Sequence, residues 1–321
     1  MKSKFARFVW AVLAYDVLVV LWGAYVRASF SGDGCGSHWP LCNGEIVPHA
    51  SQTKTLVELS HRVSSGGSLV LAVIVFAWAW RAFEKGSFAR RASAYVLAFT
   101  VSEALVGAAI VLLRLVAHDQ SLQRGVSTML HLTNTFLLLA SVAIAARAAG
   151  GARPFALRGR GWLGALTLCT IVATIVVAAT GSIAALGDTL FPSRSVAQGL
   201  AQDVAASAPL FIRLRSIHPF IAIGSAILVL GLASLAPAVR PSRDVARFAR
   251  ALSIAYFVQL GLGALNVVFL APTGLQLVHL LSADVVWIVL VMLATSALAD
   301  EEASIVNASR GGALEGSRPA R

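Results

Sequence analysis

The sequence predicts an all-α integral membrane protein with eight transmembrane helices, arranged as two pseudo-repeated four-helix bundles. Three observations support this fold class. First, 57% of the 321 residues are hydrophobic and only 13% are charged, whereas a soluble domain carries about 25% charged residues. Second, eight apolar runs are long enough to cross a membrane. Third, four histidines recur at similar positions in the two halves of the chain.

Each apolar run approaches the roughly 20 residues that a transmembrane helix needs. Lys2, Lys4 and Arg7 precede the first run, as they would in a secretory signal peptide. We expect the run to be retained, because it exceeds a typical signal core and seven more runs follow. The eight runs lie near residues 8–27, 58–80, 92–116, 125–146, 162–186, 216–236, 248–270 and 275–298.

The distribution of basic residues predicts the orientation. With a cytoplasmic N-terminus, the five inner segments hold three, four, four, four and three basic residues, which is 18 of the 26 in the chain. The positive-inside rule therefore favours both termini in the cytoplasm and a multi-pass protein surrounded by lipid in the cell (plasma) membrane. The net charge of +11 does not indicate a nucleic-acid partner, because the basic residues stand in short clusters between apolar runs.

The eight spans divide into two halves that share one orientation, because each half contains an even number of spans. Small-residue patches recur in the two halves: Gly23 and Gly181 end the first and fifth spans, and Gly107 and Gly263 lie in the third and seventh. Such patches let helices approach closely. We predict an N-terminal bundle over 1–147, a cytoplasmic linker over 148–160, a C-terminal bundle over 161–299 and a polar, disordered tail over 300–321.

Four histidines lie near the start of the even-numbered spans. His218 follows His61 by 157 residues, and His279 follows His131 by 148. Because these spans all run inward, we expect the four side chains at one depth, one to one and a half turns into their spans and near the outer face. Imidazole is costly in a bilayer unless its nitrogens are used. The pattern predicts two bis-histidine haem sites, rather than four histidines that each bond a neighbouring carbonyl.

Glu58 precedes His61 by three residues and Arg62 by four, so Glu58 and His61 share one helix face. A carboxylate one turn from a haem ligand is placed to move protons at the haem edge. The alternative is that Glu58 only pairs with Arg62 at the membrane interface. Spacing alone does not decide between these roles.

Other ionisable groups lie in or beside the spans. Carboxyl groups inside a membrane are functional candidates by default, and this applies to Asp16, Glu103 and Asp284. Four arginines toward the outer face could pair with haem propionates or anchor at lipid head groups: Arg27, Arg62, Arg213 and Arg215. Three histidines are expected to be solvated loop residues: His38, His49 and His118.

Cys35 and Cys42 lie in the first outer loop with six residues between them. The outer compartment of bacteria is oxidising, which favours a disulfide. A zinc site that includes His38 or His49, and a pair of free redox thiols, are the alternatives. We expect Cys169, inside the fifth span, to be a small buried apolar residue.

Together these motifs resemble the membrane haem A synthases. The resemblance covers about residues 5–298 and rests on Gly23-Ala-Tyr-Val-Arg27, Trp39-Pro-Leu-Cys42-Asn-Gly44, Glu58-Leu-Ser-His61-Arg62, His131, His218-Pro219 and His279-Leu280. It implies an oxidoreductase that converts a ring methyl of haem O to a formyl group, giving haem A for terminal oxidases. It implies a substrate haem between His61 and His131, a haem b between His218 and His279, a catalytic Glu58, and a disulfide between Cys35 and Cys42.

The chain departs from the family pattern at two places. Many relatives read Cys-Pro-Asp-Trp where this chain has Cys35-Gly-Ser-His-Trp39, and residues 187–215 lack a cysteine pair that some relatives carry. The resemblance implies haem O synthase and terminal oxidase assembly factors as partners, and it leaves a homo-oligomer open. Two rival functions are a di-haem b electron carrier that does no chemistry on the haem and a haem-delivery chaperone. Glu58 beside a haem ligand favours the enzyme, because a carrier has no need of it.

Overall fold

The structure, a computed structural model, describes residues 2–46, 48, 52–157, 159–205 and 207–300. Over these residues every regular element is a helix, and eight helices are long and apolar enough to span a membrane. The predicted fold class is confirmed: the protein is an all-α integral membrane protein. The helices are α1 (Lys2–Ala28), α2 (Thr53–Ala82), α3 (Phe88–Leu112), α4 (Leu122–Ala149), α5 (Gly161–Leu190), α6 (Val196–Val204), α7 (Leu210–Val239), α8 (Arg243–Val268) and α9 (Thr273–Ala297).

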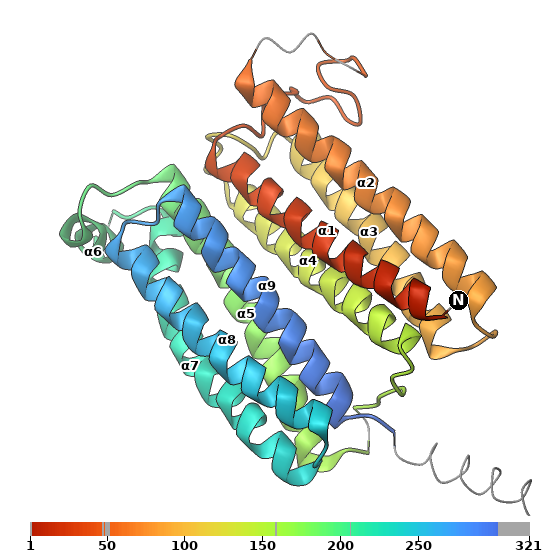
Figure 1. Cartoon of the computed structure of the whole chain (residues 1–321). Helices are drawn as coiled ribbons and strands as arrows, with labels where there is room; N and C mark the ends of the chain where they lie inside the picture. Colours follow the sequence, from red (N-terminus) through yellow and green to blue (C-terminus); the bar gives the residue numbers. More distant parts are fainter. Residues whose placement is uncertain (1, 47, 49–51, 158, 206, 301–321) are drawn as a thin grey trace, which may run out of the picture.

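The long helices form two bundles that lie side by side (Figure 1). Helices α1 to α4 form one bundle, and α5 with α7 to α9 form the other. The two bundles meet mainly where α4 packs against α5 and α9. The loop between α1 and α2 lies at the same end of the molecule as the short helix α6. The division of functions between the two bundles stays a prediction.

The even-numbered spans begin earlier than their apolar runs. Helix α2 begins at Thr53 and α7 at Leu210, whereas the apolar runs begin near 58 and 216. Consequently the four histidines lie six to nine residues beyond the first residue of their helices, which is about two turns. The predicted depth of one to one and a half turns was too shallow, because helices of 25–30 residues are longer than a hydrocarbon core of about 30 Å requires.

Aromatic and charged contacts join the two bundles at several depths. The Trp287 indole donates a 2.6 Å hydrogen bond to the Phe136 carbonyl, and the two rings stack with centroids 5.1 Å apart. Where α4 ends and α8 begins, Arg147 lies 3.4 Å from Asp244. Since an indole N–H in an apolar core needs a partner, the Trp287 bond fixes the relative height of α9 and α4.

The structure differs from the sequence-based expectations at two places, Cys169 and helix α6. Cys169 is exposed on the surface of its span and therefore faces lipid, whereas we expected it to be buried. Helix α6 was not predicted; its first turn is capped by the Ser195 hydroxyl, which accepts from the backbone N–H of Gln198. The predicted disordered tail lies outside the described residues except for Asp300, which pairs with Arg160 of the linker.

Candidate functional site

A single large cavity of about 1430 Å³ is lined by residues from all nine helices and reaches into both bundles. All four predicted histidines line it: His61, His131, His218 and His279. His61 and His131 are within electrostatic reach of one another, and so are His218 and His279. The structure therefore brings together one pair of histidines in each bundle.

In each bundle the first histidine packs against a glycine of the preceding long helix. A Cβ added to Gly23 would lie 2.8 Å from Cε1 of His61, and one added to Gly181 would lie 3.0 Å from Cε1 of His218. Optimal contacts between carbon atoms are about 3.5–4.0 Å, so any side chain at either glycine would push the imidazole away. The missing side chains of these two glycines therefore leave the space that the imidazole rings occupy, and we call each such position a glycine seat.

The second histidine of each bundle has a looser seat of the same kind. A Cβ at Gly263 would lie 3.3 Å from Cε1 of His279, and one at Gly107 would lie 3.7 Å from Cε1 of His131. The glycine pairs are 158 and 156 residues apart. Sequence reasoning recognised the recurring glycines but assigned them to contact between helices. It did not predict that the imidazole rings pack against these glycines.

The ring nitrogens fit axial ligands of a haem. Nδ1 of His61, His131 and His279 is buried and makes no hydrogen bond among the described residues, and Glu103 lies beside Nδ1 of His131, so Nε2 is the nitrogen that we assign to the iron. In His279 this Nε2 lies 3.3 Å from the Gln259 amide nitrogen, and a bound haem would replace that contact. Nδ1 of His218 lies 3.1 Å from the Thr180 hydroxyl. Over the same residues no three potential ligand side chains converge as a bare metal ion would need. Two imidazoles per site, across a large cavity, are the donor set of a porphyrin iron.

The carboxyl group of Glu103, on α3, lies next to one of these histidines, His131. Its Oε1 lies 3.3 Å from Nδ1 of His131, an ion-pair distance without the alignment of a hydrogen bond. Oε2 accepts a 2.6 Å hydrogen bond from the Asn134 amide, and the Thr135 hydroxyl donates to Oε1. Glu103 had no evident partner in the sequence, because all three partners come from α4, about 30 residues later.

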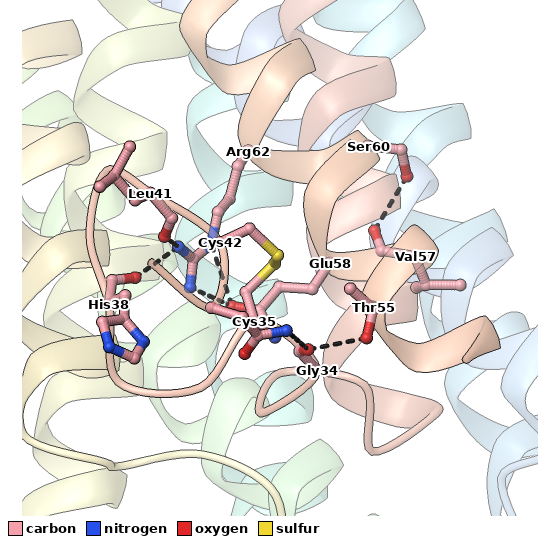
Figure 2. Close-up of a disulfide and its surroundings, with 11 residues drawn as sticks. Gly34, Cys35, His38, Leu41, Cys42, Thr55, Val57, Glu58, Ser60 and Arg62 are labelled. Carbon is pink, nitrogen blue, oxygen red and sulfur yellow. Dashed lines mark hydrogen bonds and ion pairs between the residues drawn. A yellow bond between two sulfur atoms is a disulfide. The ribbon is translucent and has the colours of Figure 1, made fainter. Parts of the chain in front are cut away.

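Glu58 is buried and holds the outer loop. Its Oε2 accepts a 2.7 Å hydrogen bond from the backbone N–H of Cys35, and Oε1 lies 2.5 Å from Nη2 of Arg62 (Figure 2). Arg62 in turn donates to the carbonyls of His38 and Leu41, at 2.6 and 2.7 Å. Glu58 also lines the cavity. It therefore reaches both the loop and the site of the histidine pair.

Cys35 and Cys42 form a disulfide, as the resemblance implied, and both are buried. The bond closes the loop beside Glu58 (Figure 2). The pairing leaves neither sulfur for the zinc site considered above. His38 is exposed and His49 lies outside the described residues.

Among the remaining charged candidates, Arg27 joins the two bundles. Arg27 donates from the N-terminal bundle to the Ala185 carbonyl and the Thr189 hydroxyl, each at 2.7 Å, and to the Gln276 side chain at 3.1 Å. These three acceptors belong to the other bundle. Arg27 is therefore an interbundle contact at the edge of the cavity, in addition to any role toward a propionate.

Two of the intramembrane carboxyl groups differ in their surroundings. Asp16 lines the cavity and accepts a 2.7 Å hydrogen bond from the Ser68 hydroxyl. Asp284 is fully buried, and neither of its oxygens has a hydrogen-bond partner within the described part of the chain. A carboxyl group without a partner in an apolar core is costly, and Asp284 is not among the residues that line the cavity.

Comparison with known proteins adds a family to this geometry. Residues 6–291 match the family model of cytochrome oxidase assembly proteins. Proteins named protoheme IX farnesyltransferase from two strains of Thermus thermophilus are 43% identical over 296 residues, which is 92% of this chain and 49% of each relative. This chain thus spans about half the length of these relatives.

Shorter matches point to the same family. Proteins named heme A synthase from Bacillus mycoides and Bacillus cereus are 37% and 36% identical over 110 residues, about a third of either chain. The family match covers most of the chain and all four histidines. The chain therefore belongs to the cytochrome oxidase assembly protein family, in agreement with its resemblance to the haem A synthases.

Proposed function

We propose that this protein is a haem A synthase, which oxidises a ring methyl of haem O to a formyl group for use in terminal oxidases. The observation that carries the proposal is the pair of histidines in each bundle, facing one shared cavity. We assign the substrate haem to His61 and His131, and a haem b to His218 and His279. When bound, haem b would supply one-electron transfer, and the protein supplies orientation and electrostatics.

The name of the Thermus relatives suggests a second candidate activity, transfer of a farnesyl group to protohaem. The match covers 49% of those relatives, so that name can describe the part of those relatives that lies outside the match. A farnesyltransferase would instead be the partner that supplies the farnesylated substrate. The terminal oxidase and its assembly factors would then receive the product. We place the protein in the plasma membrane with both termini in the cytoplasm.

Pigment analysis tests the activity. The full chain is expressed in a host that lacks its own haem A, with and without a haem O synthase, and extracted haems are separated by chromatography. Haem A that forms only in the presence of haem O supports the proposal. Only haem b in both extracts would favour the electron carrier or the chaperone, and haem O formed by this chain alone would favour a farnesyltransferase.

Variants of the histidines test the site. His218→Ala or His279→Ala should remove the low-spin haem b spectrum. His61→Ala or His131→Ala should keep that spectrum and abolish conversion of haem O. An intact haem b spectrum in His218→Ala membranes would show that the assignment of ligands is wrong.

We further propose that Glu58 acts in the oxidation, as a group that takes or gives a proton beside the substrate methyl. Its contact with the cavity supports this role, and its bonds to Cys35 and Arg62 support the structural alternative. Glu58→Gln should retain haem and accumulate haem O or a partly oxidised alcohol. Thr55→Val is the matched control, because the Thr55 hydroxyl holds the loop through the Gly34 carbonyl at 2.8 Å and makes no hydrogen bond to Glu58 in the part of the chain that the structure describes. Equal loss of haem A in both variants would mean that Glu58 only anchors the loop.

A further inference from the structure

The two bundles differ in the side chain that accompanies their second histidine. The offset of 156 residues between Gly107 and Gly263 also relates Glu103 to Gln259. Both residues lie one turn before their glycine, and both line the cavity. Glu103 faces His131 with a carboxylate, whereas Nε2 of Gln259 lies 3.3 Å from Nε2 of His279. Equivalent helix positions thus carry an acid in one half and its neutral isostere in the other. The two side chains also meet different ring nitrogens: Glu103 lies at the outer nitrogen of His131, and Gln259 lies at the nitrogen of His279 that we assign to the iron.

At two other cavity-lining positions the N-terminal half also has a carboxyl group and its counterpart in the C-terminal half does not, although those counterparts are not isosteres. Asp16 corresponds to Thr174 by the 158-residue offset of the first glycine pair, and Glu58 corresponds to Arg215 by the 157-residue offset of the first histidine pair. The N-terminal half therefore has a carboxyl group at all three places where the C-terminal half has none. Of the three, Glu103 is the one that contacts a histidine ring.

Contacts on α4 hold Glu103 in position. The Asn134 amide and the Thr135 hydroxyl donate to its two oxygens, and the Ser102 hydroxyl donates to the Asn134 side-chain carbonyl at 2.7 Å. A small rotation would align Oε1 with the Nδ1–H of His131. Gln259 lacks this support, since its side-chain oxygen is buried without a hydrogen-bond partner in the described residues.

A carboxylate that accepts from the outer nitrogen of a ligating histidine orients the ring and makes it a stronger donor to the metal. A stronger donor stabilises the oxidised iron and lowers its reduction potential. A carboxamide does so less, because it carries no charge. On the basis of the proposed function, we infer that Glu103 is a positioning residue that tunes His131, and that the Glu103–Gln259 difference separates the reduction potentials of the two haem sites.

Reciprocal substitutions test this inference. The probe is haem b added to the detergent-solubilised full chain, and the readout is a redox titration followed by absorbance, with each component assigned through His131→Ala and His218→Ala. Glu103→Gln should raise the midpoint potential of the His131 component by about 59 mV, a tenfold change for one electron, and leave the other component in place. Gln259→Glu should lower the His279 component.

Asp16→Asn is the matched control, because it removes a second cavity-lining carboxyl group that contacts Ser68 rather than a histidine. The inference is overturned if Glu103→Gln moves the His131 component no more than Asp16→Asn does. If Glu103→Gln fails to retain haem at that site, Asn134→Ala decides, because it removes the donor to Oε2 of Glu103, and an unchanged His131 component then overturns the inference. Should His131→Ala remove neither component, the ligand assignment of the proposed function fails, whatever Glu103 does.

Discussion

The glycine seats lead to a prediction that separates ligand placement from folding. In Gly23→Ala the new Cβ would lie 2.8 Å from Cε1 of His61, so the ring must retreat by about 0.7–1.2 Å to reach an ordinary carbon contact. Without haem the ring can swing aside, and alanine favours a helix over glycine by about 0.5–1 kcal/mol. With His61 bound to iron the displacement is transmitted to the substrate. A misplacement of about 1 Å can cost about 100-fold in rate.

The assay is conversion of haem O to haem A by Gly23→Ala membranes, beside their haem b spectrum. We expect about 100-fold slower conversion, unchanged protein yield and an unchanged haem b spectrum, since that haem is assigned to the other bundle. Gly66→Ala is the control: it lies in α2, it also lines the cavity, and a Cβ there meets nothing within 4 Å. Wild-type conversion by Gly23→Ala, or equal loss in Gly66→Ala, would refute the role of the seat.

Three further outcomes are expected. Cys35 and Cys42 should resist alkylation in untreated membranes and react after reduction; labelling of both without reductant would contradict the disulfide. The bond should contribute about 2–3 kcal/mol to loop order, so Cys35→Ser with Cys42→Ser should make the loop more sensitive to protease while the haem b spectrum persists. Arg27→Gln loses charged donors to three acceptors in the other bundle and should lower the melting temperature of the solubilised protein. An unchanged melting temperature would show that other contacts hold the bundles.

The fold could be predicted because each span carries its own signal. Mean hydropathy over about 20 residues locates a membrane helix without knowledge of its neighbours. The first residues of α2 and α7 were misplaced for the same reason, since Thr53, Lys54 and Thr55 make the first turn of α2 polar, and Arg213 and Arg215 interrupt the apolar residues that begin α7. Helix α6 has nine residues and no apolar run, so hydropathy could not find it.

Only those residues of the site that are unusual in their own local sequence could be predicted. A histidine in an apolar run is unusual by itself, so all four were found. The partners of Glu103 and Arg27 lie on other helices, and no local pattern indicates them. Cys169 was assigned to the core because cysteine is often buried, but a helix in lipid can present an apolar residue outward at no cost.

The equivalence of Glu58 and Arg215 explains how each half covers its part of the cavity. Both lie three residues before the first histidine of their bundle, and both hold the outer segment above it. Glu58 holds the disulfide loop through the Cys35 N–H. Arg215 lies 2.6 Å from Asp203 of α6 and 3.1 Å from Asp188 at the end of α5.

The segment beside the cavity is therefore held by a disulfide loop in one half and by ion pairs in the other. Residues 187–215 contain no cysteine pair, and the ion pairs of Arg215 provide the cross-link between α5, α6 and α7 that a disulfide could supply. The charge of each anchor fits its partners: the Cys35 N–H and the Arg62 guanidinium need an acceptor at position 58, and Asp188 and Asp203 need a base at position 215. Anchoring and proton transfer therefore both suit a carboxylic acid at position 58, which is the reason to test Glu58→Gln against a variant that loosens only the loop.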